Sequence, residues 1–266
     1  MLDLLAETLK RVWRILATGF SFILFAVGAI LVAVLGIIFI LPLPIPKFRK
    51  QLWFRNLLRI GCSFFVYVVQ LLGLLSLSTR RQVGSPVSGH IIVANHPTLL
   101  DAVILIAEFG NICCIVKQTL KKHPITALPV SLAGYIPNSS EDILELAKAK
   151  LGAGENILIF PEGTRSDKSE VVSRFKRGAA NIAINSDSPI LPVTIWCLPR
   201  TLAKQEKWYQ VPISPPRFVV TIGSPILVAD SIDVERPRTV QYRHLTRFLS
   251  DHYDRALEDA NCFIGD

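Results

Sequence analysis

Residues 15–46 contain no charged side chain, and this apolar run constrains the fold more than any other part of the chain. A helix crosses a hydrocarbon layer about 30 Å thick with about 20 apolar residues, so the run is long enough to span one. It is too long for the apolar part of a secretory signal peptide, and it lacks a small-residue cleavage site. We therefore expect residues 1–80 to form a helical region that associates with a membrane.

A second uncharged run, residues 60–79, raises the question of topology. Basic residues flank both runs: Lys10, Arg11, Arg14, Lys47, Arg49, Lys50, Arg55, Arg59, Arg80 and Arg81. Cytoplasmic loops gather positive charge, so two full spans would put the middle group on the wrong side. We expect the first segment to enter the membrane as a hairpin or to lie deep in it, with a bend near Gly28 or Gly36. We expect the second segment to be embedded in one leaflet. A single or double span is the alternative.

Residues 89–101 carry the first pattern with a chemical meaning. They predict a short buried strand that stops at a loop, where Pro97 breaks the strand and Thr98 opens a helix. Asp101, in the first helical turn, can accept one ring N–H of His96 on the loop. That contact fixes the tautomer and leaves the other ring nitrogen free to accept a proton, as a general base requires. The alternative is that Asp101 serves only the N-terminal backbone donors of the helix.

A second pattern repeats this arrangement at residues 157–166. An apolar strand, Ile157–Phe160, runs into a turn that contains Gly163 and Arg165. Such a turn can present backbone N–H groups and a guanidinium fork to a phosphate or carboxylate. If the two strands share a sheet, the two loops lie side by side. The alternatives are an ordinary turn and a solvated arginine.

Together the two loops resemble the glycerolipid acyltransferases, the family of 1-acyl-glycerol-3-phosphate acyltransferase. Asn95-His-Pro-Thr-Leu-Leu-Asp101 resembles the family's His-x4-Asp motif, and Phe160-Pro-Glu-Gly-Thr-Arg165 resembles its second signature. Ile190-Leu-Pro-Val193 resembles its fourth block, a strand that carries a proline. The resemblance covers roughly residues 80–223, and the two signatures occur in the expected order and separation.

The resemblance implies a membrane-bound O-acyltransferase that moves a fatty acyl group from acyl-CoA or acyl carrier protein to a lysophospholipid hydroxyl. It makes His96 the catalytic base and Asp101 its orienting partner. It assigns binding of the acceptor to Glu162, Gly163, Thr164 and Arg165. A thioester is already activated and the sequence contains no G-x-S-x-G nucleophile elbow, so we expect direct transfer without an acyl-enzyme. We expect no cofactor beyond the thioester co-substrate, and no metal.

One block departs from the family pattern and puts the acceptor in doubt. Residues 134–138 stand where the family usually ends a motif with an arginine that binds the acceptor's phosphate, and here the residue is Asn138. An amide brings no charge, and a charge-assisted contact is roughly twice as strong as a neutral one. Lys117 follows a strand expected at residues 112–116 and is a candidate to attract an anionic acceptor or carrier. The alternative is that Lys117 lies on a solvated helix face. Two alternatives follow: the same chemistry on another lipid or hydroxyl acceptor, and a non-enzymatic membrane scaffold.

Strands alternating with helices predict a mixed, largely parallel α/β sheet flanked by helices over residues 81–266. The net charge of +8 comes from basic residues beside apolar runs and not from a stripe with interleaved aromatics, which argues against nucleic acid as a partner. The five cysteines form no C-x-x-C pair, which fits a reducing compartment. We expect membrane lipids as partners and a location at the cytoplasmic face of the inner membrane. The oligomeric state stays open.

Overall fold

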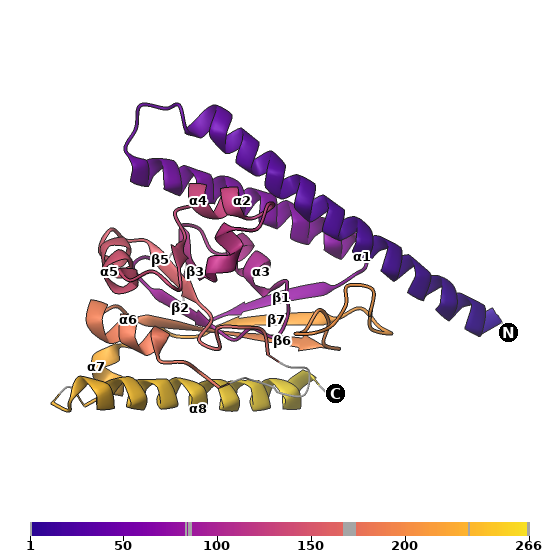
Figure 1. The fold of residues 1–266 in the computed structure, drawn as a ribbon. Coiled ribbons are helices and arrows are strands. Elements are labelled where there is room, and N and C mark those ends of the chain that lie inside the picture. Colours follow the sequence, from indigo (N-terminus) through magenta and orange to yellow (C-terminus); the bar gives the residue numbers. More distant parts are fainter. Residues whose placement is uncertain (1, 83, 85–86, 167–173, 234, 265–266) are drawn as a thin grey trace.

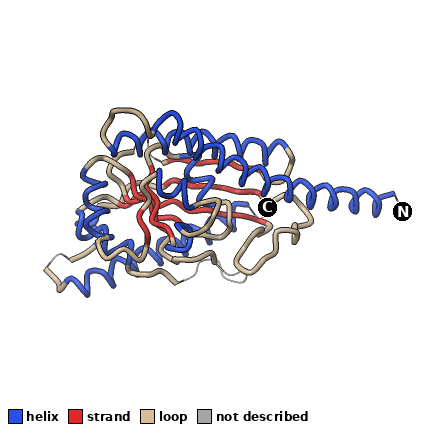
Figure 2. The backbone as a smooth tube through the Cα atoms, turned by 45° about the horizontal axis from the view of Figure 1, so that its top comes forward, coloured by secondary structure: helices blue, strands red, loops and turns tan. Residues whose placement is uncertain are grey.

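A computed structural model of the protein shows a seven-stranded sheet between two layers of helices (Figures 1 and 2). The structure describes residues 2–82, 84, 87–166, 174–233 and 235–264. The strand order is β1-β7-β6-β2-β5-β3-β4. All neighbouring strands are parallel except β6 and β7, which are antiparallel. The predicted fold class, a mixed and largely parallel α/β sheet flanked by helices, is confirmed.

The strands are β1 (Ser76–Arg81), β2 (Ile91–Ala94), β3 (Ile112–Val116), β4 (Ile136–Pro137), β5 (Asn156–Ile159), β6 (Ile190–Leu198) and β7 (Arg217–Ile222). The helices are α1 (Leu2–Leu35), α2 (Lys47–Leu71), α3 (Asp101–Glu108), α4 (Ala127–Leu132), α5 (Ile143–Gly152), α6 (Gly178–Ser186), α7 (Val228–Ser231) and α8 (Arg238–Ile264). A π-helical turn (Gly36–Ile40) extends α1, and a short 3-10 helix (Gln118–Lys121) follows β3.

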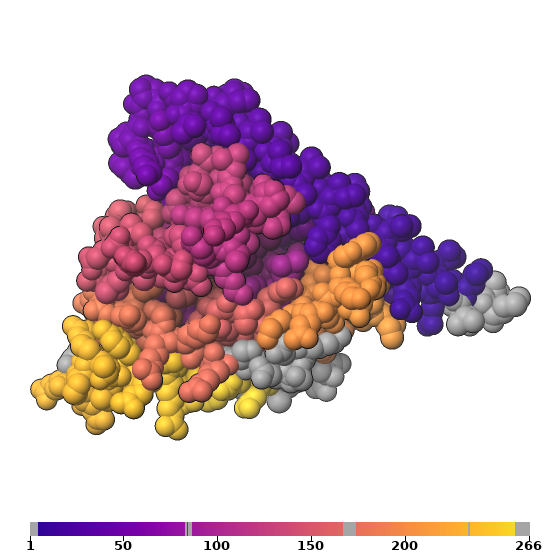
Figure 3. Space-filling model, viewed as in Figure 1, coloured from indigo at the N-terminus to yellow at the C-terminus, as the bar shows by residue number. Residues whose placement is uncertain are grey.

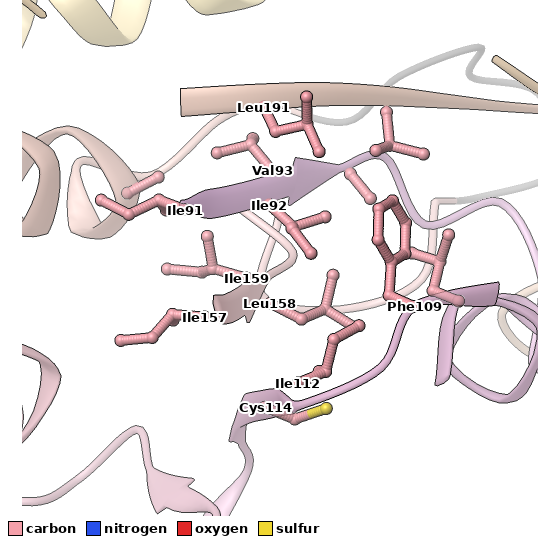
Figure 4. Close-up of a cluster of buried hydrophobic side chains, with 14 of the residues drawn as sticks. Ile91, Ile92, Val93, Phe109, Ile112, Cys114, Ile157, Leu158, Ile159 and Leu191 are labelled. Carbon is pink, nitrogen blue, oxygen red and sulfur yellow. The ribbon is translucent and has the colours of Figure 1, made fainter. Parts of the chain in front are cut away.

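The centre of the sheet is apolar on both faces. Every residue of β2 and β5 is buried, and eight of the nine residues of β6 are buried as well. A parallel strand covered by helices on both sides needs a continuous apolar run and not an alternating one, which is what these strands contain. Figure 4 shows side chains of β2, β5 and β6 packing with Phe109, Ile112 and Cys114. Cys113 and Cys114 are buried in β3, so the sequence expectation that they act as small hydrophobes is confirmed.

The two helical layers have different origins in the chain. In Figure 1, α6, α7 and α8 cover one face of the sheet, whereas α3 and α4 lie on the other face beneath the α1–α2 hairpin. Contacts of α2 with α3, and of α1 and α2 with α4, hold the hairpin on this second layer. The predicted domain division at residue 80 falls inside β1, which follows α2 and pairs with β7.

The N-terminal region is a helical hairpin. Of the two positions where a bend was expected, helix α1 continues without interruption through Gly28 and changes to the π form at Gly36. A Cβ at Gly36 would lie 2.4 Å from the ring of Phe54, so glycine permits the close approach of the two helices. The chain then reverses through residues 41–46, which contain three prolines and so break the helix.

One stripe of α1 faces the protein and the opposite face is open. Ala17, Ser21, Ala33 and Gly36 are buried, at spacings that place them on one side of the helix. Exposed apolar side chains cover the rest of the helix: Leu16, Phe20, Ile23, Val27, Ile30, Leu31, Val34 and Ile38. Leu5–Ile40 and Lys47–Leu71 are each long and apolar enough to cross a membrane. A large exposed apolar surface of this kind is typical of a lipid or protein contact.

A buried ion pair ties the hairpin to the sheet. Arg55 of α2 is 3% exposed, and its Nη1 lies 2.6 Å from Oε2 of Glu155, just before β5. The same guanidinium donates to the carbonyl oxygen of Ala133 at 2.8 Å and to Oδ1 of Asn111 at 3.2 Å. Lys150 adds a second cation 3.1 Å from the Glu155 carboxylate. These contacts fix the position of α2 on the edge of the sheet where the parallel strands begin.

Glu155→Ala would leave the buried Arg55 guanidinium without its counter-charge. Removing one partner of a buried pair costs about 3–5 kcal/mol, so we expect a clear fall in the midpoint of thermal unfolding of the solubilised protein. Glu145→Ala is the matched control, because its pair with Lys148 is exposed and contributes less than about 0.5 kcal/mol. Equal midpoints for the two variants would contradict this account of the hairpin's attachment.

Candidate active site

The candidate site lies at the edge where the parallel strands end. Val93 of β2 pairs with Ile159 of β5, so the loops that follow these strands leave the sheet together. In open α/β sheets, this edge is where ligands bind. The N–H of Ser166 in the second loop donates to the carbonyl oxygen of His96 in the first, at 2.9 Å. The sequence expectation that the two loops lie side by side is confirmed.

His96 and Asp101 form the predicted pair. Nδ1 of His96 lies 2.8 Å from Oδ2 of Asp101, and the Asp101 side chain is fully buried whereas that of His96 is 18% exposed. A carboxylate is an acceptor only, so the contact places the proton on Nδ1 and leaves Nε2 as the unprotonated nitrogen of the neutral ring. The imidazole also stacks on the ring of Phe160, with centroids 4.2 Å apart. The ring is therefore held from two sides.

Asp101 also holds the loop that carries the histidine. Its carboxylate accepts the backbone N–H of Thr98 at 2.7 Å and the Thr98 hydroxyl at 2.6 Å. The helix α3 begins at Asp101, so the expectation that Thr98 opens it is wrong: these contacts hold residues 98–100 in a turn before the helix. The alternative reading, in which Asp101 serves only backbone donors, describes part of its role, because the same carboxylate also binds the His96 ring.

Glu162 joins the two loops. Its Oε1 accepts the backbone N–H of His96 at 2.8 Å, and its Oε2 accepts the Ser166 hydroxyl at 2.5 Å. The residue is 3% exposed, so this carboxylate lies inside the loop pair. These contacts place Glu162 against the backbone of His96, and its assignment to acceptor binding stays a prediction.

Gly163 occupies a position that needs glycine. Its φ is +69°, in the left-handed region, and a Cβ there would lie 2.8 Å from Nζ of Lys176. Its N–H donates to the carbonyl oxygen of Phe160 at 3.0 Å and closes the turn. The expectation that this N–H is presented to an anion is therefore wrong for Gly163. Thr164 is partly exposed beside it.

Arg165 points toward the long segment between β6 and β7, residues 199–216, which we call the β6–β7 excursion. One nitrogen, Nη1, donates to the carbonyl oxygens of Leu202 and Ala203 at 2.8 and 3.1 Å. Among the described residues, the structure gives Nε and Nη2 no hydrogen-bond partner. A partly exposed guanidinium fixed at one nitrogen retains donors for an anionic ligand.

Lys117 and Asn138 lie along the same edge, farther from the histidine. Lys117 follows β3 and Asn138 follows β4, and both are exposed. With strands about 4.8 Å apart, β3 lies roughly 10 Å and β4 roughly 14 Å from β2. The Asn138 Oδ1 accepts the backbone N–H of Gln118 at 3.2 Å, so this side chain caps the 3-10 helix. The structure thus brings Lys117 to the edge of the site and gives Asn138 a local structural contact.

Tyr253, which sequence reasoning missed, shapes the strand ends beneath the histidine together with Pro192 and Asn95. Pro192 of β6 stands opposite Val93 and has no N–H. The Tyr253 hydroxyl of α8 donates to the carbonyl oxygen of Val93 and accepts the N–H of Val193 at 3.1 Å. The Asn95 side chain then exchanges two hydrogen bonds with the backbone of Ile195, at 2.7 and 2.8 Å. Together they link β2 to β6 up to the residue before His96.

The described cysteines of the sheet are poorly suited to nucleophilic catalysis. Burial raises the pKa of the thiols of Cys113, Cys114 and Cys197 above their ordinary value, so each stays protonated at neutral pH. Within the described ranges, no group of three or more His, Cys, Asp or Glu side chains is arranged to hold a metal ion. The expectations of no metal and no cofactor stay predictions.

Comparison with known proteins connects this edge of the sheet to a family. Residues 79–196 match a family model described as Acyltransferase, a range that contains both loops. The 1-acyl-sn-glycerol-3-phosphate acyltransferase of Helicobacter pylori is 35% identical over 123 residues, 43% of this chain and 52% of that protein. The protein of the same name from Pseudomonas aeruginosa is 26% identical over 157 residues, 56% of this chain and 60% of that protein. The chain thus spans about half the length of the curated relatives it matches.

A solved structure extends the similarity to the whole fold. The crystal structure of the 1-acyl-sn-glycerophosphate acyltransferase from Thermotoga maritima matches with a TM-score of 0.72 at 19% identity. The match covers 94% of this chain and 98% of that one. Since so little of the chain is left out, the shared fold includes most of the helical hairpin as well as the sheet.

Tyr253→Phe removes one hydroxyl and leaves two buried backbone groups without that partner. An unsatisfied buried group costs about 1–3 kcal/mol, so we expect a lower free energy of unfolding by about 2 kcal/mol or more. The control is Tyr242→Phe on the same helix, whose hydroxyl accepts the partly buried Asn185 amide at 2.9 Å. A Tyr253→Phe protein as stable as the Tyr242→Phe protein would contradict this role.

Proposed function

We propose that this chain is a membrane-bound O-acyltransferase of the glycerolipid acyltransferase family that acts on a lysophospholipid. The acyl group would come from a thioester, acyl-CoA or acyl carrier protein, and the acceptor would be a hydroxyl such as that of 1-acyl-glycerol-3-phosphate. The observation that carries the proposal is the His96–Asp101 pair, 2.8 Å apart and adjacent to the Arg165 loop. That arrangement supplies a base and an anion-binding group at one edge.

The reaction is a direct transfer. Nε2 of His96 accepts the acceptor's hydroxyl proton as its oxygen attacks the thioester carbonyl carbon, and the ester bond forms as the C–S bond breaks. The proton on His96 then passes to the departing thiolate, which leaves as a free thiol and restores the neutral ring. The buried Asp101 carboxylate stabilises the imidazolium between these two steps. Protonated thiols at Cys113, Cys114 and Cys197 support transfer without an acyl-enzyme.

Positive charge along the edge that carries the histidine favours an anionic acceptor. Arg165 lies on the loop after β5 and Lys117 at the end of β3, at the same edge of the sheet. A guanidinium and an ammonium form charge-assisted hydrogen bonds with a phosphate. They provide the positive charge that Asn138 lacks, so we propose a phosphorylated lysolipid as the acceptor. Glu162, Gly163 and Thr164 complete the loop that positions it.

The hairpin would place this edge at a lipid surface. One face of α1 packs on the protein through Ala17, Ala33 and Gly36, so lipid can reach only the opposite face. We propose that α1 and α2 lie in one leaflet, at the cytoplasmic face of the inner membrane, with the basic flanks on anionic headgroups. Acceptor and product would then enter and leave the site within the bilayer.

The direct test is release of free thiol from acyl-CoA or acyl carrier protein by the protein reconstituted in lipid with lysophosphatidate. We expect acceptor-dependent release, and a loss on the order of 10²–10⁴-fold or more in His96→Ala, because the base is gone. His90→Ala is the matched control, since His90 precedes β2 at the opposite edge of the sheet and should leave the rate unchanged. Silence of the wild-type protein with every donor and acceptor would favour a non-enzymatic role.

Lys117→Gln should change the choice of acceptor more than the rate of chemistry. Loss of one charge-assisted contact should raise KM for lysophosphatidate about tenfold, with little effect on kcat or on monoacylglycerol, which has no phosphate. Lys148→Gln, on α5, serves as the control. If the wild-type protein prefers an unphosphorylated acceptor, the alternative of another lipid or hydroxyl acceptor is correct and the proposed phosphate contact is wrong.

A further inference from the structure

The β6–β7 excursion connects the active-site loops to the hairpin. Near its start, the carbonyl oxygen of Leu202 accepts from the backbone N–H of Leu99 at 3.2 Å and from Arg165. At its end, the carbonyl oxygen of Pro216 accepts the N–H of Ser76, five residues after the end of α2. The excursion is therefore attached at one end to the loops around His96 and at the other to the segment that follows the hairpin.

The middle of the excursion packs on α1. The ring centroids of Trp208 and Phe22 are 6.5 Å apart, and Trp208 also lies against Gly19, where a Cβ would be 3.2 Å from its ring. In the space-filling view, the orange atoms of the excursion lie against the indigo atoms of α1 (Figure 3). The excursion thus continues the surface of the helix that carries the long uncharged run.

The surface that results is apolar and aromatic, and it is open. Trp208 and Tyr209 keep about half of their area exposed, at 46% and 45%, and Ile213 is 92% exposed. Trp13 of α1, at the same end of the hairpin, is 54% exposed and donates its ring N–H to the carbonyl oxygen of Leu72 at 3.2 Å. Tryptophan and tyrosine concentrate at the headgroup level of a bilayer, because one end of each ring system is apolar and the other polar.

The charge of this segment is positive. Residues 199–216 contain three basic side chains, Arg200, Lys204 and Lys207, and one acidic side chain, Glu206. Lys207 is exposed, and its Nζ lies 5.7 Å from the ring centre of Tyr209. Lysine and arginine near a membrane surface are attracted to anionic lipids. The charge therefore complements an anionic headgroup layer.

We propose that the β6–β7 excursion is a second membrane-contact surface, which places Trp208, Tyr209 and Ile213 in the headgroup region of an anionic bilayer beside α1. The hairpin alone would fix only one side of the protein to the lipid. The excursion adds a contact on the active-site side, because its first residues bind Arg165 and the loop after His96. The edge of the sheet would then face the lipid surface at a fixed height.

The test uses a fluorescent label at position 213, which does not require enzymatic activity. Ile213→Cys is made together with Cys62→Ser and Cys262→Ser, labelled with a polarity-sensitive dye, and reconstituted into phosphatidylglycerol–phosphatidylcholine vesicles with and without brominated chains. The matched control carries Leu227→Cys in place of Ile213→Cys, since Leu227 is 54% exposed and lies just before α7, on the opposite side of the sheet from the hairpin.

We expect brominated lipid to quench the dye at position 213 at least several-fold more than the dye at position 227. Equal and weak quenching at both positions would overturn the proposal and indicate that the excursion faces water or a protein partner. In the thiol-release assay, Ile213→Glu should lower kcat/KM for an acceptor embedded in vesicles about tenfold, because it loses burial of one large apolar side chain. It should leave the rate with a short-chain, water-soluble acceptor within about twofold. The quenching result stands even if the proposed reaction fails.

Discussion

The arrangement of the candidate active site depends on one buried carboxylate. Asp101 accepts the ring N–H of His96 and both the backbone N–H and the hydroxyl of Thr98, and its side chain has no contact with solvent. A buried carboxylate is stable only when donors surround it, so the loop must take the conformation that supplies them. The same contacts orient the imidazole with Nε2 unprotonated. The contacts that fix the conformation of the loop are therefore the same contacts that orient the base.

The second loop and the strands beneath add contacts from distant parts of the chain. Glu162 binds the backbone of His96 from the neighbouring loop, and Phe160 stacks on the ring. Tyr253 reaches the strand from the last helix, where its hydroxyl bridges the carbonyl oxygen of Val93 and the N–H of Val193. A base that acts on a hydroxyl must be held within a fraction of an ångström of the productive geometry. The loop after β5 and helix α8 share that task with Asp101.

Much of this could be predicted from the sequence, and the limits have physical causes. The His96–Asp101 pair and the neighbouring second loop follow from local patterns, because a strand, a loop and a helix start constrain residues only a few positions apart. The role of Tyr253 could not be predicted, since 160 residues separate it from Val93 and a tyrosine in an amphipathic helix carries no local signal. The function of Asn138 as a cap on Gln118 likewise depends on how β3 and β4 pair.

The central claim is that Asp101 holds His96 as a neutral base with its proton on Nδ1. Nitrogen-15 NMR of histidine-labelled protein measures this directly, with the His96 signals assigned by their absence from the His96→Ala protein. The expected result is a neutral ring that is protonated at Nδ1 and unprotonated at Nε2, and a loss of that preference in Asp101→Asn. A neutral ring that carries its proton on Nε2 in the wild-type protein would contradict the account, because the nitrogen that faces the acceptor could then not accept its proton.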